Sequence, residues 1–348
     1  MFFASDNAGP VHPKVMESLV KANAGYAPAY GNDPIMEQVR AKVREVFEAP
    51  DAAVYLVATG TAANSLLLAT MTKPWETIFC STMSHIQEDE CNAPEFYTGA
   101  KLTLVPTEAA KMMPDALRQA VLKENSRGVH GPQRGPVSIT QATEKGSVHS
   151  VADIQALTGV ARDYGLKTHM DGARFTNALV HLGCTAADMT WKAGIDAVSF
   201  GGTKNGLMGV EGCVIFDPAL AWEFELRRKR GAHLFSKHRY LSAQMLAYLT
   251  DDLWLNMARA ANARMARLYA GLRQIAGVEI DIAPQANLIF ARLPRSAHHR
   301  LHAAGAVYYV WDGNHETGDP DELLTARFVC DWSGTEQSVD DLLAGIRG

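Results

Sequence analysis

Short apolar, β-branched runs alternate with longer segments of helical periodicity through the first two-thirds of the chain. The runs that predict strands are residues 53–58, 77–80, 101–105, 136–141, 166–170, 195–200 and 212–216. The segments between them that predict helices include AANSLLLATM, PDALRQAVLKE, VADIQALTGVARDYG and FTNALVHLG. This alternation predicts an α/β fold, in which a mostly parallel sheet is covered by helices on both faces. Ligands of such sheets bind at the carboxyl ends of the strands.

The pattern changes in the last third of the chain. A helical stretch covers roughly residues 240–275 without a proline, and after Gly277 come the apolar segments VEIDI, NLIFARL, AVYYVW and LLTARFVCDW. A closing helix is expected around EQSVDDLLAGI. These features predict a smaller α+β domain after a long helix. We therefore expect an N-terminal arm over residues 1–12, a large domain over 13–250 and a small C-terminal domain over 251–348.

Composition narrows the kind of ligand. The chain has 348 residues, 47% hydrophobic and 20% charged, which is the range of globular proteins with a large core. With 33 Lys plus Arg against 38 Asp plus Glu, it offers no broad basic face for nucleic acid. The first ten residues, MFFASDNAGP, do not look like a signal peptide. Five cysteines without paired spacing argue against a disulfide framework or a zinc site and favour a reducing compartment, the cytoplasm. We expect a small-molecule ligand and no metal.

An uncharged window over residues 52–72 approaches the length of a membrane span. Its polar residues, Gly60, Thr61 and Asn64 among them, argue against a position in lipid. The window is better interpreted as strand, glycine turn and helix, whose first N–H groups point at an anion. Because it lacks GxxxxGK[ST] and GxGxxG, a lone phosphate fits better than a nucleotide. A capped helix without any ligand is the alternative for this turn.

Two residues at expected strand ends point to one cofactor. Lys204 follows IDAVSF within SFGGTKNGLMG, where glycines allow a ligand to approach and an amine suits imine chemistry. Asp171 follows a buried strand in LKTHMDGAR, and an ionised acid there needs a cationic partner. An imine-forming lysine and an acid for a ring nitrogen are what pyridoxal 5′-phosphate (PLP) requires. The alternatives are a surface lysine in a glycine loop and a helix N-cap near Gly172.

A histidine and an acid follow the strand TIFC. His85 and Glu88 in STMSHIQEDECNAP are three residues apart, so on one helical turn they share a face. An imidazole and a carboxylate so placed could act together in proton transfer at neutral pH. A lone structural histidine is the alternative.

Six segments occur in a fixed order: FASDNAGP, AYGNDP, ATGTAANSL, SHIQEDE, HMDGAR and SFGGTKNG. With them the chain resembles the low-specificity L-threonine aldolases, PLP enzymes of fold type I in the β-eliminating lyase superfamily. The long helix and small domain are also similar, so the resemblance covers essentially the full chain. It implies a three-layer α/β/α large domain of the PLP-dependent transferase type. It also implies reversible cleavage of L-threonine, L-allo-threonine and related β-hydroxy-α-amino acids such as phenylserine to glycine and an aldehyde.

The resemblance also implies roles for individual residues. Lys204 would hold PLP as a Schiff base, Asp171 would hold the pyridinium nitrogen, and His85 would stack on the ring. Gly60 and Thr61 would bind the phosphate. We favour His85 as the base that takes the β-hydroxyl proton, with Glu88 tuning it.

For the substrate carboxylate the resemblance implies Arg174, with Ser5 and Arg327, because an arginine fork suits a carboxylate. RRKRGAHLFSKHRYLSAQ resembles a family segment that reaches across a subunit interface, so Lys237 would contact a phosphate in a homotetramer built from dimers with shared sites. Tyr30 and Asp33 in AYGNDP are expected near the same site, although aromatic packing and a turn explain them nearly as well.

One departure leaves substrate recognition open. Many family members carry Glu-Asn-Thr-His after the strand that reads PVSITQ here, whereas this chain has Gln141, Ala142, Thr143 and Glu144. A Glu therefore replaces a His considered for substrate contact, and the identity of the general base stays open. Another PLP reaction on this scaffold, such as transamination or β-elimination, is the nearest alternative function. A PLP-binding protein without turnover is less favoured, since no helix-turn-helix or basic extension is recognisable.

Overall fold

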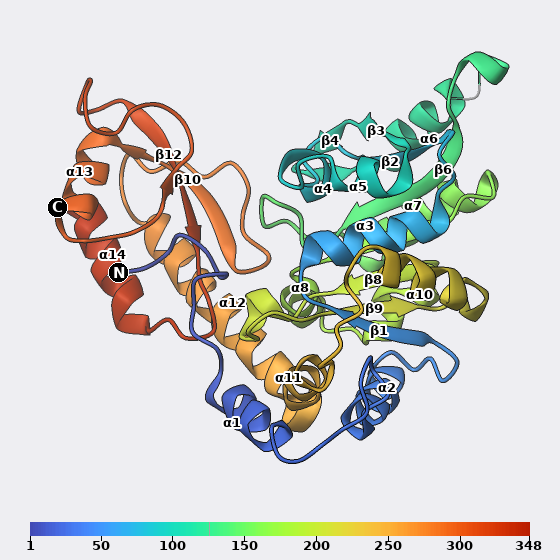
Figure 1. The fold of residues 1–348 in the computed structure, drawn as a ribbon. Helices are drawn as coiled ribbons and strands as arrows, with labels where there is room; N and C mark the ends of the chain where they lie inside the picture. The colour runs from blue at the N-terminus through green and yellow to red at the C-terminus, as the bar shows by residue number, and fades with distance from the viewer. Residues whose placement is uncertain (125) are drawn as a thin grey trace.

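The computed structural model describes residues 1–124 and 126–348, and its main feature is a seven-stranded sheet (Figure 1). The strands are, in sheet order, β1 (Ala53–Val57), β9 (Glu211–Ile215), β8 (Ala197–Phe200), β7 (Thr168–Gly172), β6 (Gln133–Thr140), β2 (Glu76–Ser81) and β3 (Lys101–Val105). Neighbours from β8 to β3 are parallel, whereas β9 runs antiparallel to both β8 and β1. Each of the seven strands lies where the pattern predicts one, and the predicted α/β fold with a mostly parallel sheet is confirmed.

Helices cover both faces of this sheet. In β1, Val54 and Leu56 belong to one hydrophobic core while Tyr55 and Val57 belong to another, because alternate side chains of a strand point to opposite faces. The helices of the large domain are α1 (Pro13–Ala22), α2 (Pro34–Val46), α3 (Gly60–Met71), α4 (His85–Glu88), α5 (Ala93–Thr98), α6 (Pro114–Lys123), α7 (Val151–Asp163), α8 (Phe175–Leu182), α9 (Ala186–Met189), α10 (Ala221–Arg230) and α11 (Arg239–Leu249). A hairpin of β4 (Thr107–Glu108) and β5 (Lys111–Met112) completes it. The main sheet is therefore the middle layer of three.

The uncharged window over residues 52–72 is made of β1, a short turn and α3. All five residues of β1 are buried, as are nine of the twelve residues of α3. The absence of charge therefore reflects two elements packed inside the large domain. In residues 1–124 and 126–348, no helix has the length and apolar character needed to cross a membrane.

The long helical stretch expected over residues 240–275 is two helices, so that prediction is wrong in detail. α11 ends at Leu249 and α12 (Leu253–Leu272) begins after a kink, where Asp251 and Asp252 both have φ of 53°. Aspartate adopts this left-handed conformation more readily than most residues because its short side chain can hydrogen-bond locally. α12 then joins two cores: Met257 packs in the main core and Met265 in the core of the small domain.

The C-terminal part forms a second, smaller unit around a three-stranded antiparallel sheet (Figure 1). Its elements are β10 (Leu288–Pro294), α13 (Arg295–Ala303), β11 (Tyr309–Val310), β12 (Leu323–Val329) and α14 (Glu336–Arg347), with β12 in the centre of the sheet. The N-terminal segment joins it, because Phe3 packs in its core and donates its backbone N–H to the Val307 carbonyl at 2.8 Å. The exact domain boundaries, at residues 12 and 250, stay predictions.

Candidate functional site

A cleft of about 250 Å³ lies at the carboxyl ends of the parallel strands. It is lined by Asn7, Ala58, Thr59, Gly60, Thr61, Asn64, His85, Glu90, Asp171, Ala173, Thr203, Lys204 and Glu211. Five of these were expected from the sequence: Gly60, Thr61, His85, Asp171 and Lys204. They follow or end β1, β2, β7 and β8, and the parallel sheet brings these strand ends to one edge.

Lys204 lies in a single 3₁₀ turn, Thr203–Asn205, just after β8. The preceding glycines are required by close packing: a Cβ on Gly201 would collide with the Ala173 carbonyl oxygen, and one on Gly202 would lie 2.6 Å from the Val210 carbonyl oxygen. The turn can therefore pack against the end of β7, which places the amine in the same cleft as Asp171. A second acid, Glu211, also lines the cleft; its burial raises the pKa, although Thr203 and Lys204 oppose that rise.

Asp171 is buried at the end of β7 and holds two hydrogen bonds. One oxygen accepts from the Asn64 side-chain amide at 3.0 Å and the other from the Ala173 backbone N–H at 3.0 Å. The alternative role as a helix N-cap is excluded, because α8 begins at Phe175 with Arg174 as its cap. Both bonds come from neutral donors, so the carboxylate can still take a cationic partner in the cleft.

His85 pairs with Glu90 and not with Glu88, so the predicted partner is wrong. Its Nδ1 lies 2.8 Å from Glu90 Oε1, which also accepts from Asn64 at 2.9 Å. α4 is one turn long and the chain turns at Asp89, so Glu90 is buried while Glu88 stays exposed. The hydrogen bond to Glu90 raises the pKa of His85 above its ordinary value, against the opposing effect of burial.

Asn64 and Glu90 are the functional candidates that the sequence did not reveal. Together they join Asp171 to His85 through one continuous set of side-chain hydrogen bonds. Asn64 lies one helical turn after Gly60, so its position on the cleft face of α3 could have been read from helical spacing. Nothing in the local pattern distinguishes Glu90 from Glu88, because the choice depends on where α4 ends.

The start of α3 is open towards the cleft. Thr59 caps the helix by accepting from the Ala62 N–H at 3.2 Å. A Cβ added at Gly60 would meet nothing within 4 Å, so there is space in front of the helix. Free N–H groups and the helix dipole favour an anion at such a position. The arrangement fits the phosphate that the sequence predicts at Gly60 and Thr61.

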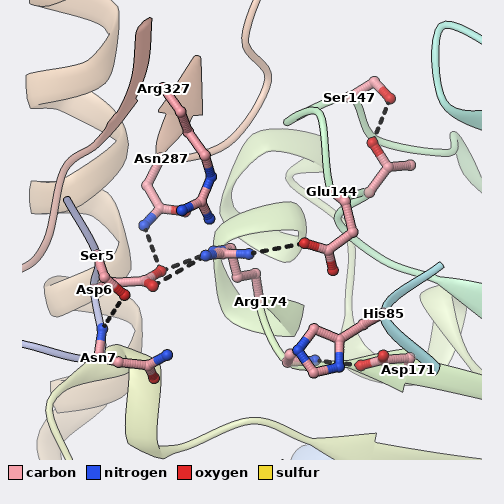
Figure 2. Close-up of polar contacts among 12 residues, drawn as sticks. Ser5, Asp6, Asn7, His85, Glu144, Ser147, Asp171, Arg174, Asn287 and Arg327 are labelled. Atoms are coloured by element: carbon pink, nitrogen blue, oxygen red, sulfur yellow. Dashed lines mark hydrogen bonds and ion pairs between the residues drawn. The ribbon is translucent and has the colours of Figure 1, made fainter. Parts of the chain in front are cut away.

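A buried arginine lies beside the cleft. Arg174 donates from Nε and Nη2 to Asp6 at 2.8 and 3.0 Å, and its Nη1 lies 4.0 Å from Glu144 (Figure 2). Asn287 of the small domain also donates to Asp6, at 3.0 Å. Burial would raise the pKa of Asp6, but Arg174 and Lys204 outweigh it and hold that pKa below its ordinary value. The N-terminal arm is therefore tied to both domains at this point.

The predicted carboxylate-binding residues lie together. Figure 2 shows Ser5 next to Asp6 and Arg327 above Arg174. Ser5 accepts the Asn7 N–H at 3.1 Å, and Arg327 donates weakly to the Ala4 carbonyl at 3.4 Å. Burial, with the nearby Arg174, lowers the pKa of Arg327, and the Asp6 and Glu144 carboxylates oppose that change.

The remaining predicted residues do not reach the cleft within one chain. Asp33 is buried and caps α2 by accepting the Met36 N–H at 2.9 Å, so its place is explained by a turn. The backbone N–H of Tyr30 donates to the carbonyl oxygen of Ser236 at 3.1 Å. Tyr30 and Lys237, the residue after Ser236, are both exposed. Neither lines the cleft around Lys204.

Comparison with solved structures identifies the fold type. A Leishmania major threonine aldolase matches with a TM-score of 0.92 and 24% identity, covering 99% of this chain and 98% of that one. A Sphingomonas wittichii serine palmitoyltransferase matches with a TM-score of 0.72 and 14% identity, covering 100% and 86%. At this identity the likeness concerns the fold alone, and it confirms the predicted PLP-dependent transferase fold, fold type I.

Comparison of sequences identifies the family to which the chain belongs. A family model described as beta-eliminating lyase matches residues 3–293. Two curated relatives, one from a Pseudomonas species and one from Pseudomonas aeruginosa, are each 39% identical over 346 and 347 residues, covering 99% of this chain and 96% of the relative. Both carry the name low specificity L-threonine aldolase. With that match, and with the strand-end cleft around Lys204, the chain belongs to the beta-eliminating lyase family.

Proposed function

We propose that this protein is a PLP-dependent low-specificity L-threonine aldolase. It cleaves L-threonine, L-allo-threonine and related β-hydroxy-α-amino acids reversibly to glycine and an aldehyde. The observation that carries the proposal is the cleft in which Lys204, Asp171 and His85 meet the start of α3. The names of the curated relatives, at 39% identity over nearly the whole chain, support the same reaction.

The residues of the cleft fit PLP. Asp171 is a buried carboxylate held by neutral donors, which suits a protonated ring nitrogen, and the open start of α3 at Gly60 and Thr61 suits a phosphate. Lys204 would hold the cofactor through its amine, and His85, which lines the same cleft, would stack on the ring. When bound, PLP supplies the electron sink for the pair of electrons left when the Cα–Cβ bond breaks.

Arg327 and Arg174, with Ser5, bind the substrate carboxylate in this proposal. Asp6 holds one edge of the Arg174 guanidinium, so this side chain is already oriented and loses little freedom on binding. Among the residues that the structure describes, Arg327 donates one weak hydrogen bond, to Ala4, so its fork can still donate to a carboxylate. Holding the carboxylate orients the Cα–Cβ bond for cleavage.

His85 acts as the general base. Because Nδ1 donates to Glu90, the neutral imidazole presents Nε2 as an acceptor. The β-hydroxyl proton moves to Nε2 while the hydroxyl oxygen becomes the carbonyl oxygen of the aldehyde. Glu90 stabilises the imidazolium that forms, as the buried acid of a catalytic triad does. Glu90 thus positions His85 and raises its pKa, the role that the sequence suggested for Glu88.

Product stoichiometry tests the function. The purified protein with PLP is incubated with L-threonine, L-allo-threonine and phenylserine, and glycine, aldehyde, ammonia and keto acid are measured together. We expect glycine and aldehyde in equal amounts without ammonia or keto acid. Ammonia or keto acid would instead indicate β-elimination or transamination, reactions of enzymes on this fold. Bound PLP without any turnover would indicate a non-catalytic protein.

The proposal extends to assembly and location. Tyr30 and Lys237 are both exposed, the backbone of Tyr30 bonds that of Ser236 next to Lys237, and neither side chain lines the cleft. We propose a homotetramer, a dimer of dimers, in which a second copy brings Lys237 to the phosphate. Light scattering of the PLP-bound protein tests this, and a monomer would contradict it. The unpaired spacing of the cysteines favours the reducing cytoplasm.

A further inference from the structure

A second cavity, of about 430 Å³, opens next to Arg327. Glu144 and Lys145, from the loop after β6, line its large-domain side, together with residues of the α4 segment. Phe290, Tyr309 and Trp311 line its small-domain side. We call these three residues the aromatic wall. The cavity therefore lies between the two domains, and of its lining the proposed reaction uses Arg327.

The aromatic wall is a consequence of strand register. Phe290 and Tyr309 lie directly opposite Arg327 on either side of β12, so the three side chains share one face of the small sheet. Trp311 follows two residues after Tyr309 and is on the same side. Its ring centroid lies 5.2 Å from that of Phe290 at an interplanar angle of 85°. Tyr309 and Trp311 remain 52% and 57% exposed, which leaves large aromatic surfaces free to contact a ligand.

The cavity adjoins the reacting part of the substrate. Arg327 belongs both to this cavity and to the carboxylate-binding group, and Glu144 lies 4.0 Å from Arg174. Glu88, from the same helical turn as His85, lines the opposite side. A substrate with its carboxylate on Arg327 and its β-hydroxyl near His85 therefore directs its β-substituent into the cavity. The cavity falls in the range of about 300–1,000 Å³ that whole small ligands occupy, far more than the methyl group of threonine requires.

Charge in the cavity is unevenly distributed. Its carboxylates are Glu88, Asp89 and Glu144, which we call the acidic rim, and its cations are Lys145 and Arg327. The Lys145 amine lies 3.6 Å from the Phe290 ring centroid, so it is held on the aromatic wall. Once the substrate carboxylate neutralises Arg327, Lys145 is the remaining cation among the described residues that line the cavity, although Glu144 also lies 4.0 Å from Arg174. An anionic β-substituent would then be repelled, whereas an uncharged aromatic ring would not.

We propose that the aromatic wall determines specificity for the β-substituent, favouring uncharged aryl groups over the methyl group of threonine and over anionic aryl groups. This rests on the proposed aldolase function. The ring of the substrate packs on Trp311 and Tyr309, and the acidic rim excludes negative charge. The two parts of the selection rest on different residues and are tested separately.

The aryl preference is tested by the ratio of kcat/KM for phenylserine to kcat/KM for L-threonine. We expect Trp311→Ala to lower this ratio about fivefold to tenfold, mainly through KM for phenylserine, because an aromatic contact is lost. Tyr309→Ala should also lower this ratio, whereas Trp311→Phe should retain most of the preference for phenylserine. Trp75→Ala is the matched control, because Trp75 is 62% exposed but precedes the amino end of β2, at the opposite edge of the sheet.

The charge selection is tested in the synthetic direction, with glycine and either benzaldehyde or 4-carboxybenzaldehyde. We expect kcat/KM for the carboxylated aldehyde to be about fivefold lower. The difference in kcat/KM between the two aldehydes should be smaller in the double variant Glu88→Gln, Asp89→Asn. It should also be smaller in about 1 M salt, where charges are screened beyond about 3 Å.

Two outcomes overturn this inference while the function stands: threonine is cleaved but the aryl ratio is unchanged in Trp311→Ala and Tyr309→Ala, or the carboxylated aldehyde reacts as well as benzaldehyde. If no substrate yields glycine, the proposed function itself fails.

Discussion

The cleft around Lys204 and the cavity along the aromatic wall differ in how their side chains are held. In the cleft, Asp171, Asn64, Glu90 and His85 form one hydrogen-bonded chain, and all but His85 are buried. In the cavity, Tyr309, Trp311 and two carboxylates are exposed. Bond cleavage needs groups fixed in advance, because reorganisation at the moment of reaction costs rate. Recognition of varied β-substituents tolerates side chains that are exposed and not joined by hydrogen bonds in this way.

The two regions also differ in origin. Most cleft residues lie in the turns and helix starts that follow strands of the main sheet, whereas the cavity combines a large-domain loop with the small sheet. We therefore expect changes in the cleft to affect all substrates alike and changes in the cavity to alter the ratio between substrates.

The largest effect is expected for Lys204→Ala. Removing the amine that attaches the cofactor should lower the rate for every substrate by at least about 10⁴-fold. The measurement is glycine release, accompanied by borohydride reduction of the bound cofactor to the protein. A variant that still carries PLP in a borohydride-reducible bond would contradict the assignment of Lys204.

His85→Asn should lower turnover by about 10²–10⁴-fold, because a positioned general base is lost. Since His85 acts on the β-hydroxyl that all substrates share, threonine and phenylserine should be affected by the same factor. Steady-state kinetics with both substrates measure this. Near-full activity would assign the proton transfer to water or another residue, and a changed ratio would remove the distinction between the two regions.

Asp6→Asn should destabilise the protein by about 3 kcal/mol, since it leaves the buried Arg174 guanidinium without its ion pair. Asp340→Asn is the control: its partner Arg267 and Asp340 itself are 44% and 42% exposed, and such surface pairs contribute at most about 1 kcal/mol. Urea unfolding of both variants gives the comparison. Equal losses of unfolding free energy in the two variants would show that Asp6 does not anchor the N-terminal arm.

The smallest effect is expected for Glu90→Gln, as a displaced pH profile. Glu90 raises the pKa of His85, and the base works in its neutral form, so activity falls as pH drops through that pKa. Without the charge of Glu90 the pKa falls, and the acid limb of kcat/KM should move to lower pH for all substrates. Glu88→Gln should move this limb less, because Glu88 is exposed. A larger displacement in the Glu88 variant would reverse the assignment.

Local patterns in the sequence were sufficient for the sheet and for five of the thirteen residues that line the cleft. Runs of apolar residues located all seven strands of the main sheet, and Lys204, Asp171 and His85 were recognisable because each lies at or just beyond a strand end. The kink at Asp251 escaped prediction, since the apolar spacing continues across it and only the left-handed backbone interrupts the helix. The pairing of His85 with Glu90 was not predicted either, because packing decides at which residue α4 ends.

The sequence by itself determined the strands of the main sheet, where the reactive side chains stand relative to them, and that a strand, a turn and a helix make up the uncharged window. Only the tertiary structure decided which groups meet across long separations. Arg174 and Asp6 are 168 residues apart, and the row of Phe290, Arg327 and Tyr309 depends on strand register. Propensity and periodicity act over a few residues, whereas these contacts follow from how the sheets and the arm pack together.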